Sequence, residues 1–217
     1  MDAILKRFPR YVWICLAAVL GVQTVCYIFT EPFLDTSALH HLETAWDYQI
    51  PFRPEWVLVY LLCMPWWFVG GLLILADDKT YGIRFTLAYI LALIVSAVVF
   101  LVYPGTLTRP ELTGDGFFMD IMRLVYGIDT PTNLCPSLHV MLSYYIWRGT
   151  LDSRKLPRWY KWFCFIFLVL VCFSILYVKQ HVLIDIPSAL LIGEAALQIA
   201  NLTKPERFFL RNEPQSE

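Results

Sequence analysis

Long, uninterrupted apolar runs are the feature that most restricts how this 217-residue chain can fold. A helix needs about 20 consecutive apolar residues to cross the hydrocarbon core of a bilayer, and the sequence contains several runs close to that length. Only 16% of the residues are charged and 58% are hydrophobic, whereas about a quarter of an average soluble domain is charged. The sequence therefore predicts an all-α, polytopic membrane protein.

Six apolar runs are candidate transmembrane helices. The predicted spans are residues 11–30, 56–76, 85–103, 136–150, 162–178 and 182–201. The fourth is the shortest, and a crossing there requires the long side chain of Arg148 to extend toward the membrane surface. The basic flank of the first run is also typical of a signal peptide, but no small-residue cleavage site follows, which favours a retained helix. We therefore expect one six-helix membrane domain over residues 1–217.

Basic residues are divided unequally between the two ends of such a bundle. Six crossings put both termini on one side, together with all but four of the 17 Lys and Arg residues. The four exceptions are Arg53, Arg109, Arg123 and Lys179. Because cytoplasmic loops carry the excess of basic residues, we expect cytoplasmic termini and extracytoplasmic loops at 31–55, 104–135 and 179–181. The formal net charge of -1 provides no basic surface for nucleic acid, so we expect no nucleic-acid partner.

Two segments of the predicted outer loops have apolar residues at helical spacing. Residues 37–46 fit an amphipathic helix lying in the membrane interface, with Asp35 or Thr36 near its N-cap. Residues 117–126 fit a second one. Such helices either anchor the loops to the membrane or shape an opening for a lipid head group.

Three outer segments carry polar side chains that require an explanation, and the first contains Arg109. This residue follows the third apolar run. Its guanidinium is a planar fork of donors suited to a phosphate or a carboxylate. The alternative is an interfacial arginine bonded to lipid head groups or loop carbonyls.

The second segment is Pro136-Ser137-Leu138-His139 at the start of the fourth apolar run. Proline suits the first helical turn, and the free N–H groups there, with the Ser137 hydroxyl, form a binding site for an anion. A histidine beside that anion can donate a proton to a leaving oxygen. In the alternative interpretation Ser137 is only a helix cap and His139 is a hydrogen-bonded interfacial residue.

The third segment contains Lys179, His181 and Asp185 between the last two apolar runs. If the chain is helical from 181 onward, His181 and Asp185 lie on one face, one turn apart. The carboxylate can then accept the imidazole Nδ1–H and leave Nε2 free to act as a nucleophile. A purely structural His–Asp bond is one alternative. A metal site is another, although catalytic zinc has three protein ligands.

The topology expected from hydropathy and basic residues brings these three segments to the same outer end of the bundle. Together they provide a nucleophile with an orienting carboxylate, a proton donor, two cations and a helix N-terminus. These are the groups that phosphoryl transfer through a phosphohistidine requires.

The three segments, in this order, resemble the type 2 phosphatidic acid phosphatase superfamily of integral membrane lipid phosphatases and phosphotransferases. Its pattern is K-x6-R-P, then P-S-G-H, then S-R-x5-H-x3-D. Arg109-Pro110 matches the end of the first motif, Pro136-Ser137-Leu138-His139 the second, and Ser174, His181 and Asp185 the third.

The resemblance implies six helices around an outward-facing polar site that hydrolyses a lipid phosphate without a metal or other cofactor. It makes His181 the nucleophile, Asp185 its partner, and His139 the acid that protonates the leaving group and then activates water. The phosphate-binding residues implied by the same pattern are Arg109, Lys179, Ser137 and the amide of Leu138.

Three positions depart from the family pattern. Val102 stands where the first motif has lysine, Ile175 where the third has arginine, and Leu138 where the second has glycine. Lys179, two residues before His181, restores one cation, but an ammonium cannot reproduce the bidentate arginine contact. Fewer cations favour a monoester or diester over a diphosphate.

From these observations we expect a membrane phosphatase acting on phosphatidic acid, a related glycerolipid phosphate or a polyprenyl phosphate, with the bilayer and this lipid as its partners. One alternative is a phosphotransferase of the sphingomyelin or inositol phosphorylceramide synthase type. Another is a non-catalytic lipid-binding or transport protein. The sequence leaves the oligomeric state open.

Overall fold

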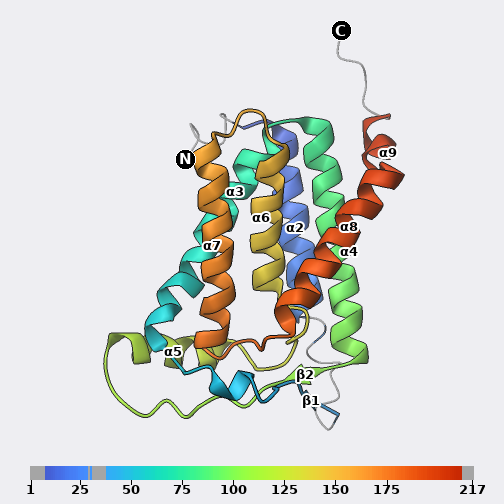
Figure 1. The fold of residues 1–217 in the computed structure, drawn as a ribbon. Helices are drawn as coiled ribbons and strands as arrows, with labels where there is room; N and C mark the ends of the chain where they lie inside the picture. The colour runs from blue at the N-terminus through green and yellow to red at the C-terminus, as the bar shows by residue number, and fades with distance from the viewer. Residues whose placement is uncertain (1–7, 29, 31–37, 212–217) are drawn as a thin grey trace.

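The computed structural model describes residues 8–211 except residues 29 and 31–37. Its long helices run between the two ends of a bundle, with α8 tilted across the others (Figure 1). They are α2 (Arg10–Ile28), α3 (Val57–Leu75), α4 (Lys79–Val102), α6 (Leu138–Asp152), α7 (Arg158–Tyr177) and α8 (Asp185–Thr203). The start of α2 and the end of α8 lie at one end of the bundle, which also carries the short helix α9 (Glu206–Leu210). We call this the terminal end and the opposite one the site end.

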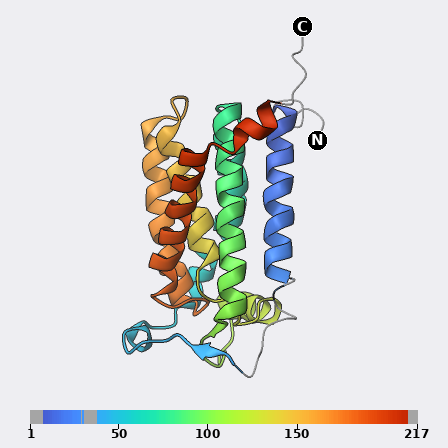
Figure 2. The same ribbon diagram turned by 90° about the vertical axis from the view of Figure 1, so that its right-hand side faces the viewer.

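The site end is covered by the loops and by α5 (Phe117–Ile128), which lies across the bundle (Figure 1). Two-residue strands β1 (His40–His41) and β2 (Gly105–Thr106) pair in parallel there. The 3-10 turns η2 (Asp47–Gln49) and η3 (Pro54–Trp56) complete the first loop and lead into α3. Figure 2 shows α2 at the edge of the bundle, beside α4.

Local capping signals explain where two helices begin. The Asp78 carboxylate accepts a hydrogen bond from the Tyr81 N–H at 2.7 Å, so α4 begins at Lys79 and is longer than the predicted span 85–103. The Ser137 hydroxyl accepts from the Val140 N–H at 3.3 Å and caps α6. Both caps satisfy first-turn N–H groups that have no acceptor within the helix.

Helix α6 packs into the middle of the bundle and contributes fully buried side chains to the core, among them Val140, Met141 and Tyr145. Its approach to α3 requires glycine on both sides. A Cβ at Gly70 would lie 2.5 Å from Ile146 Cγ2, and one at Gly149 would lie 2.8 Å from Ile74 Cγ2. Larger residues at these positions would push α3 and α6 apart.

Five helices are long and apolar enough to cross a membrane: 10–27, 54–75, 79–102, 158–177 and 185–203. This confirms the predicted helical membrane protein at the level of five spans among the described residues. Helix α6 has 15 residues and is therefore only about 22 Å long. The sixth span stays a prediction. The helices present exposed apolar side chains suited to acyl chains, including Leu58, Leu62, Val98, Leu101, Ile166 and Leu191.

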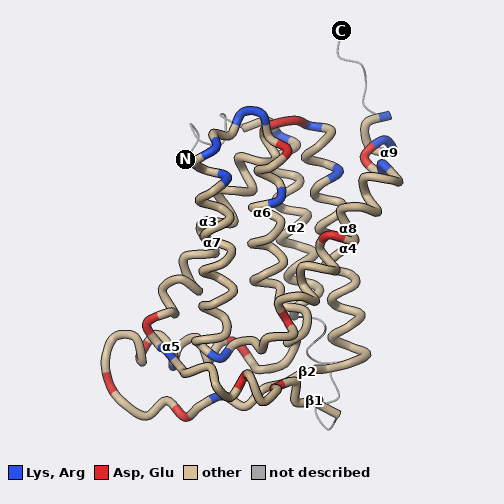
Figure 3. Tube along the Cα trace, in the orientation of Figure 1, with Lys and Arg blue, Asp and Glu red and all other residues tan. Residues whose placement is uncertain are grey.

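Charged residues are segregated along the bundle axis. Figure 3 shows Lys and Arg concentrated at the terminal end, whereas acidic residues prevail at the site end. The uneven division of basic residues in the sequence is therefore also a division between the two ends of the folded bundle.

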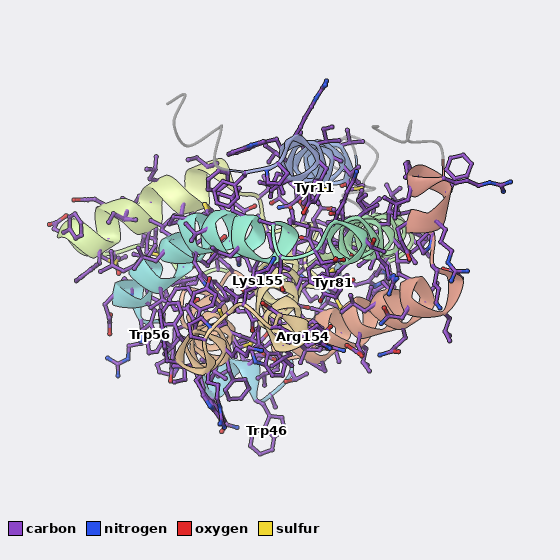
Figure 4. The ribbon with its side chains drawn as sticks, turned by 90° about the horizontal axis from the view of Figure 1, so that it is seen from above. Tyr11, Trp46, Trp56, Tyr81, Arg154 and Lys155 are labelled. Carbon is purple, nitrogen blue, oxygen red and sulfur yellow. The ribbon has the colours of Figure 1, made fainter. Side chains whose placement is uncertain are left out.

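The predicted interfacial helix at 37–46 is wrong in its described part. His40 donates its N–H to the Pro104 carbonyl at 2.9 Å, and Leu42 donates to the Thr106 carbonyl at 3.2 Å, so this backbone is extended. Pairing with the segment after α4 overrides the helical spacing of the apolar side chains. Figure 4 shows the ring of Trp46 projecting away from the bundle. Ser37 and the suggested caps Asp35 and Thr36 lie outside the described residues.

The predicted helix at 117–126 is confirmed as α5. Met122 and Val125 are buried against the bundle, whereas Phe117, Leu124 and Ile128 are exposed. Exposed apolar residues on a helix lying across the end of the bundle fit a position in the membrane interface.

Candidate active site

His181 lies in the turn between α7 and α8 and not on a helix, so the helical condition considered for residue 181 onward is not met, and α8 begins later than the predicted span 182–201. Lys179 adopts a left-handed conformation with φ of 52°. The N–H groups of Gln180 and His181 then donate to the Ile175 carbonyl at 3.0 and 3.1 Å. This closure of the α7 C-terminus turns the chain back, and α8 begins four residues after the histidine, at Asp185.

The predicted contact between His181 and Asp185 is nevertheless present. His181 Nδ1 lies 3.0 Å from Asp185 Oδ2 and 3.0 Å from the Leu134 carbonyl oxygen. A carbonyl oxygen can only accept, so Nδ1 carries the hydrogen and donates it to this pair of acceptors. In neutral His181 the lone pair is therefore on Nε2, which is the tautomer a nucleophilic histidine requires.

Asp185 connects the second and third motifs. Its side chain is fully buried, and Oδ2 also accepts the Val182 N–H at 3.0 Å. Its backbone carbonyl accepts the Ser137 N–H at 3.3 Å, which ties the start of α8 to the start of α6. The same residue thus orients His181 and fixes the position of the P-S-L-H segment.

His139 lies in the first turn of α6 and faces His181. The two imidazole rings are edge to face, with centroids 5.7 Å apart. The His139 ring stacks on Tyr60 at 4.5 Å and contacts Trp67 at 5.4 Å, both from α3. These aromatic contacts hold the His139 ring at the position where the sequence predicts an acid.

Ser137 and Leu138 have different environments. Ser137 is fully buried and its hydroxyl caps α6, which agrees with the alternative interpretation of this residue. Leu138 lines the same cavity as the two histidines. The N–H groups of Leu138 and His139 belong to the first turn of α6, where helices bind anions.

The Arg109 guanidinium is hydrogen-bonded to other residues of the protein and does not reach the cavity beside the two histidines. Its Nη1 donates to the Asp129 carbonyl at 2.6 Å, and its Nη2 donates to the Gln180 side-chain oxygen. The guanidinium lies over the Tyr126 ring, 4.4 Å from its centroid. Arg109 does not line the cavity, but Asp129 and Gln180 do. Its positive charge therefore lies one residue away from the space beside His181.

Lys179 points away from the predicted phosphate site. Its Nζ donates to the Asp47 carbonyl at 2.9 Å and does not contribute to the cavity wall. Burial lowers the pKa of the Lys179 ammonium below its usual value, and the neighbouring Asp47 carboxylate opposes this effect. The hydrogen bond from Lys179 to Asp47 attaches the first outer loop to the α7–α8 turn. The left-handed backbone of Lys179 directs its side chain toward Asp47.

Gln180 occupies the place that the sequence prediction gave to Lys179. It is buried, lines the cavity beside His181, and accepts a hydrogen bond from Arg109. Its Nε2 has no hydrogen-bond partner among the described residues. The contact with Arg109 fixes the oxygen of the amide toward the guanidinium, so the buried Nε2 group is the side of the amide that remains unpaired within the described part of the chain. In the sequence, the one feature that could have indicated Gln180 as a site residue is its position between Lys179 and His181.

A cavity of about 690 Å³ begins at the two histidines and extends between α2, α3, α4 and α6. Its end near the histidines is polar and includes Gln180, Asp129 and Thr132. The remainder is lined mainly by apolar side chains, such as Leu16, Val19, Phe68, Ile74 and Leu142. One continuous space therefore combines a polar end containing two histidines with a long hydrocarbon-like interior.

Elsewhere in the bundle, Glu194 of α8 accepts a hydrogen bond from Gln198 at 2.5 Å and one from the Tyr144 hydroxyl. It lies outside the cavity wall. These contacts to its own helix and to α6 give Glu194 a structural role. Among the described residues, no three His, Cys, Asp or Glu side chains are grouped as metal ligands.

Comparison of this chain with protein-family models, curated proteins and solved structures gives no match. The resemblance to type 2 phosphatidic acid phosphatases therefore rests on the three motifs alone.

Proposed function

We propose that this protein is an integral membrane phosphatase that hydrolyses a lipid phosphate through a phosphohistidine at His181. The observation that carries the proposal is the pair of acceptors on His181 Nδ1, at 3.0 Å each, which leaves Nε2 available beside His139. The long apolar cavity that continues from the two histidines supports a lipid as the phosphate ester.

The reaction proceeds in two steps. His181 Nε2 attacks the phosphorus, the ester P–O bond breaks, and the leaving oxygen takes a proton from His139, whose charged form is stabilised by the phosphate anion bound beside it. His139, now neutral, then accepts a proton from water as the water oxygen bonds to phosphorus, and the P–N bond breaks to release inorganic phosphate. Asp185 stabilises the positive charge on the His181 ring while the phosphoryl group is attached.

Donors bordering the polar end of the cavity hold the phosphate oxygens. They are the Nε2 of Gln180 and the first-turn N–H groups of α6 at Leu138 and His139. Arg109 polarises the Gln180 amide and adds its positive charge from behind. This arrangement provides fewer direct cationic contacts than an arginine clamp does, which favours a phosphate monoester.

The site belongs on the extracytoplasmic face in this proposal. Basic residues gather at the terminal end, and the positive-inside rule places that end in the cytoplasm (Figure 3). Both termini are then cytoplasmic, and α6 serves as a short sixth crossing in a locally thinned bilayer.

The test is phosphate release from a set of lipid phosphates in detergent with EDTA, comparing wild type with His181→Ala and His139→Ala. We expect release by wild type to persist in EDTA, no turnover by His181→Ala, and a loss of about 10²- to 10⁴-fold for His139→Ala. His41→Ala is the matched control, because His41 is an exposed histidine on β1, outside the cavity wall.

Release that EDTA abolishes, or that survives in His181→Ala, would overturn the phosphohistidine mechanism. If no lipid releases phosphate, the same proteins are assayed with an alcohol acceptor. Transfer of the phosphoryl-containing group to that alcohol would replace the phosphatase by a phosphotransferase.

A further inference from the structure

Helix α2 contributes one long wall of the cavity, and Gln23 is a polar residue in that wall. The α2 residues that line the cavity nearer to the terminal end are apolar, among them Leu16 and Leu20. Gln23 follows Leu20 by about one turn toward the site end. Tyr27, one further turn along, donates its hydroxyl to Asp129 at the polar end. Gln23 therefore lies where the polar end of the cavity meets its apolar interior.

The amide of Gln23 is held in one orientation by α4. Tyr89 of α4 is only 2% exposed, and its hydroxyl donates to Gln23 Oε1 at 3.2 Å. Among the described residues no other acceptor contacts this buried hydroxyl, so the oxygen of the amide must face Tyr89. The Nε2 group then lies on the other side of the amide. It carries two N–H donors, and no described residue accepts a hydrogen bond from them.

Two other polar side chains of the cavity wall direct their donors to protein groups instead. Trp67 Nε1 donates to the Ser143 hydroxyl at 2.9 Å, and the Tyr145 hydroxyl donates to the Gly193 carbonyl at 3.1 Å. Gln23 differs from both, because its bond to α4 uses only the oxygen of the amide. An unpaired donor in an apolar, membrane-spanning helix is costly and therefore indicates a polar group of a ligand at this level.

The position of Gln23 limits which part of a lipid phosphate it can contact. In the proposed function the phosphate lies at His181, and the hydrocarbon chain has no acceptor. The linkage that joins the phosphate to the chain lies between these two parts. An acyl linkage, either ester or amide, has a carbonyl oxygen that accepts hydrogen bonds, whereas an alkyl ether lacks the carbonyl and a prenyl chain is attached directly to the phosphate.

We propose that Gln23 is a specificity-determining residue, which binds the acyl carbonyl of the lipid substrate through its Nε2 group. The inference rests on the proposed function, which places the phosphate at His181 and the chain in the apolar interior. It adds a selection for acyl-linked lipid phosphates over ether-linked and prenyl phosphates. If Gln23 served only to attach α2 to α4, its replacement would affect all these lipids equally.

The first experiment compares three phosphate monoesters that differ only in the linkage to the chain. They are the hexadecanoyl ester of ethylene glycol phosphate, the hexadecanoyl amide of phosphoethanolamine, and the hexadecyl ether of ethylene glycol phosphate. Phosphate release is measured in detergent with EDTA. A buried donor left unpaired lowers kcat/KM roughly 5- to 150-fold, so we expect wild type to prefer the ester or the amide over the ether by that factor. The better of the two identifies the acyl linkage.

The variant Gln23→Met keeps the length of the side chain and removes the donor. We expect kcat/KM to fall for the acyl-linked lipids and to change little for the ether, so that the preference disappears. Gln198→Met is the matched control, because Gln198 is an exposed glutamine of α8 outside the cavity wall, and it should retain the preference. Gln23→Met leaves the Tyr89 hydroxyl without its acceptor. The double variant with Tyr89→Phe removes both partners and provides the test if the single variant does not fold.

The second experiment measures binding without catalysis, by calorimetric titration with non-hydrolysable phosphonate analogues of the ester and the ether. We expect wild type to bind the ester analogue about fivefold more tightly or better, and Gln23→Met to bind the two equally. Equal kcat/KM for the three lipids in wild type, or a preference that persists without the Gln23 amide, would overturn the inference while leaving the phosphatase intact. If no lipid releases phosphate, the proposed function fails, and the dissociation constants alone decide whether Gln23 binds an acyl carbonyl.

Discussion

Replacement of Asp185 by asparagine separates two tasks of this carboxylate, namely holding the His181 tautomer and stabilising the charged ring. In serine hydrolases the corresponding Asp→Asn change lowers kcat about 10⁴-fold, because the histidine adopts the wrong tautomer. Here the Leu134 carbonyl also accepts from His181 Nδ1 at 3.0 Å. The backbone therefore continues to favour the Nδ1–H tautomer in Asp185→Asn, and only the charge is lost.

The expected size of the effect follows from that difference. A hydrogen bond to a charged group contributes about 1.5–3 kcal/mol, which corresponds to roughly a 10- to 150-fold loss of kcat in Asp185→Asn. Stability should fall as well. Asp185 Oδ1 is buried and has no hydrogen-bond partner among the described residues, so an amide nitrogen in its place would be unsatisfied at a cost of about 1–3 kcal/mol.

The assay measures steady-state phosphate release and, by rapid quench, the formation of acid-labile phosphoenzyme from a radiolabelled lipid phosphate. We expect slower phosphoenzyme formation with a correctly folded protein, checked by its thermal unfolding in detergent. A loss near 10⁴-fold would show that the Leu134 carbonyl does not hold the tautomer. Unchanged activity would show that Asp185 is only structural, and either result would refute the reasoning.

Two further predictions concern residues with competing roles. Ser137→Ala removes the α6 cap, and we expect a loss of about 1 kcal/mol in unfolding free energy with kcat/KM nearly unchanged; a fall in kcat/KM beyond tenfold at equal stability would instead restore Ser137 as a phosphate ligand. Burial lowers the pKa of Lys179, so the unfolded chain binds more protons than the native one between that lowered value and the ordinary 10.5. We therefore expect the Tm of wild type to rise relative to Lys179→Met as pH increases toward 10.5, and a relative fall over this range would contradict the burial of Lys179.

Local features were predictable from the sequence because they depend on neighbouring residues. Helix α5 follows from apolar spacing within twelve residues, and the start of α6 from Pro136 and Ser137. The His181–Asp185 bond is present although residue 181 is not helical, since the turn between α7 and α8 brings the two side chains together. Errors arose where a distant segment decided the backbone, as in the pairing of β1 with β2.

The sequence by itself determined that the chain is an apolar, helical membrane protein and that two histidines and an aspartate gather at one end. Apolar run length and short-range spacing carry that information. Tertiary structure alone decided that Lys179 binds the first loop and that Gln180, not Lys179, lines the cavity. It also decided that Arg109 contacts Gln180 and lies outside the cavity wall. The direction of a side chain at a turn, and the space left between helices, depend on packing across segments more than 70 residues apart.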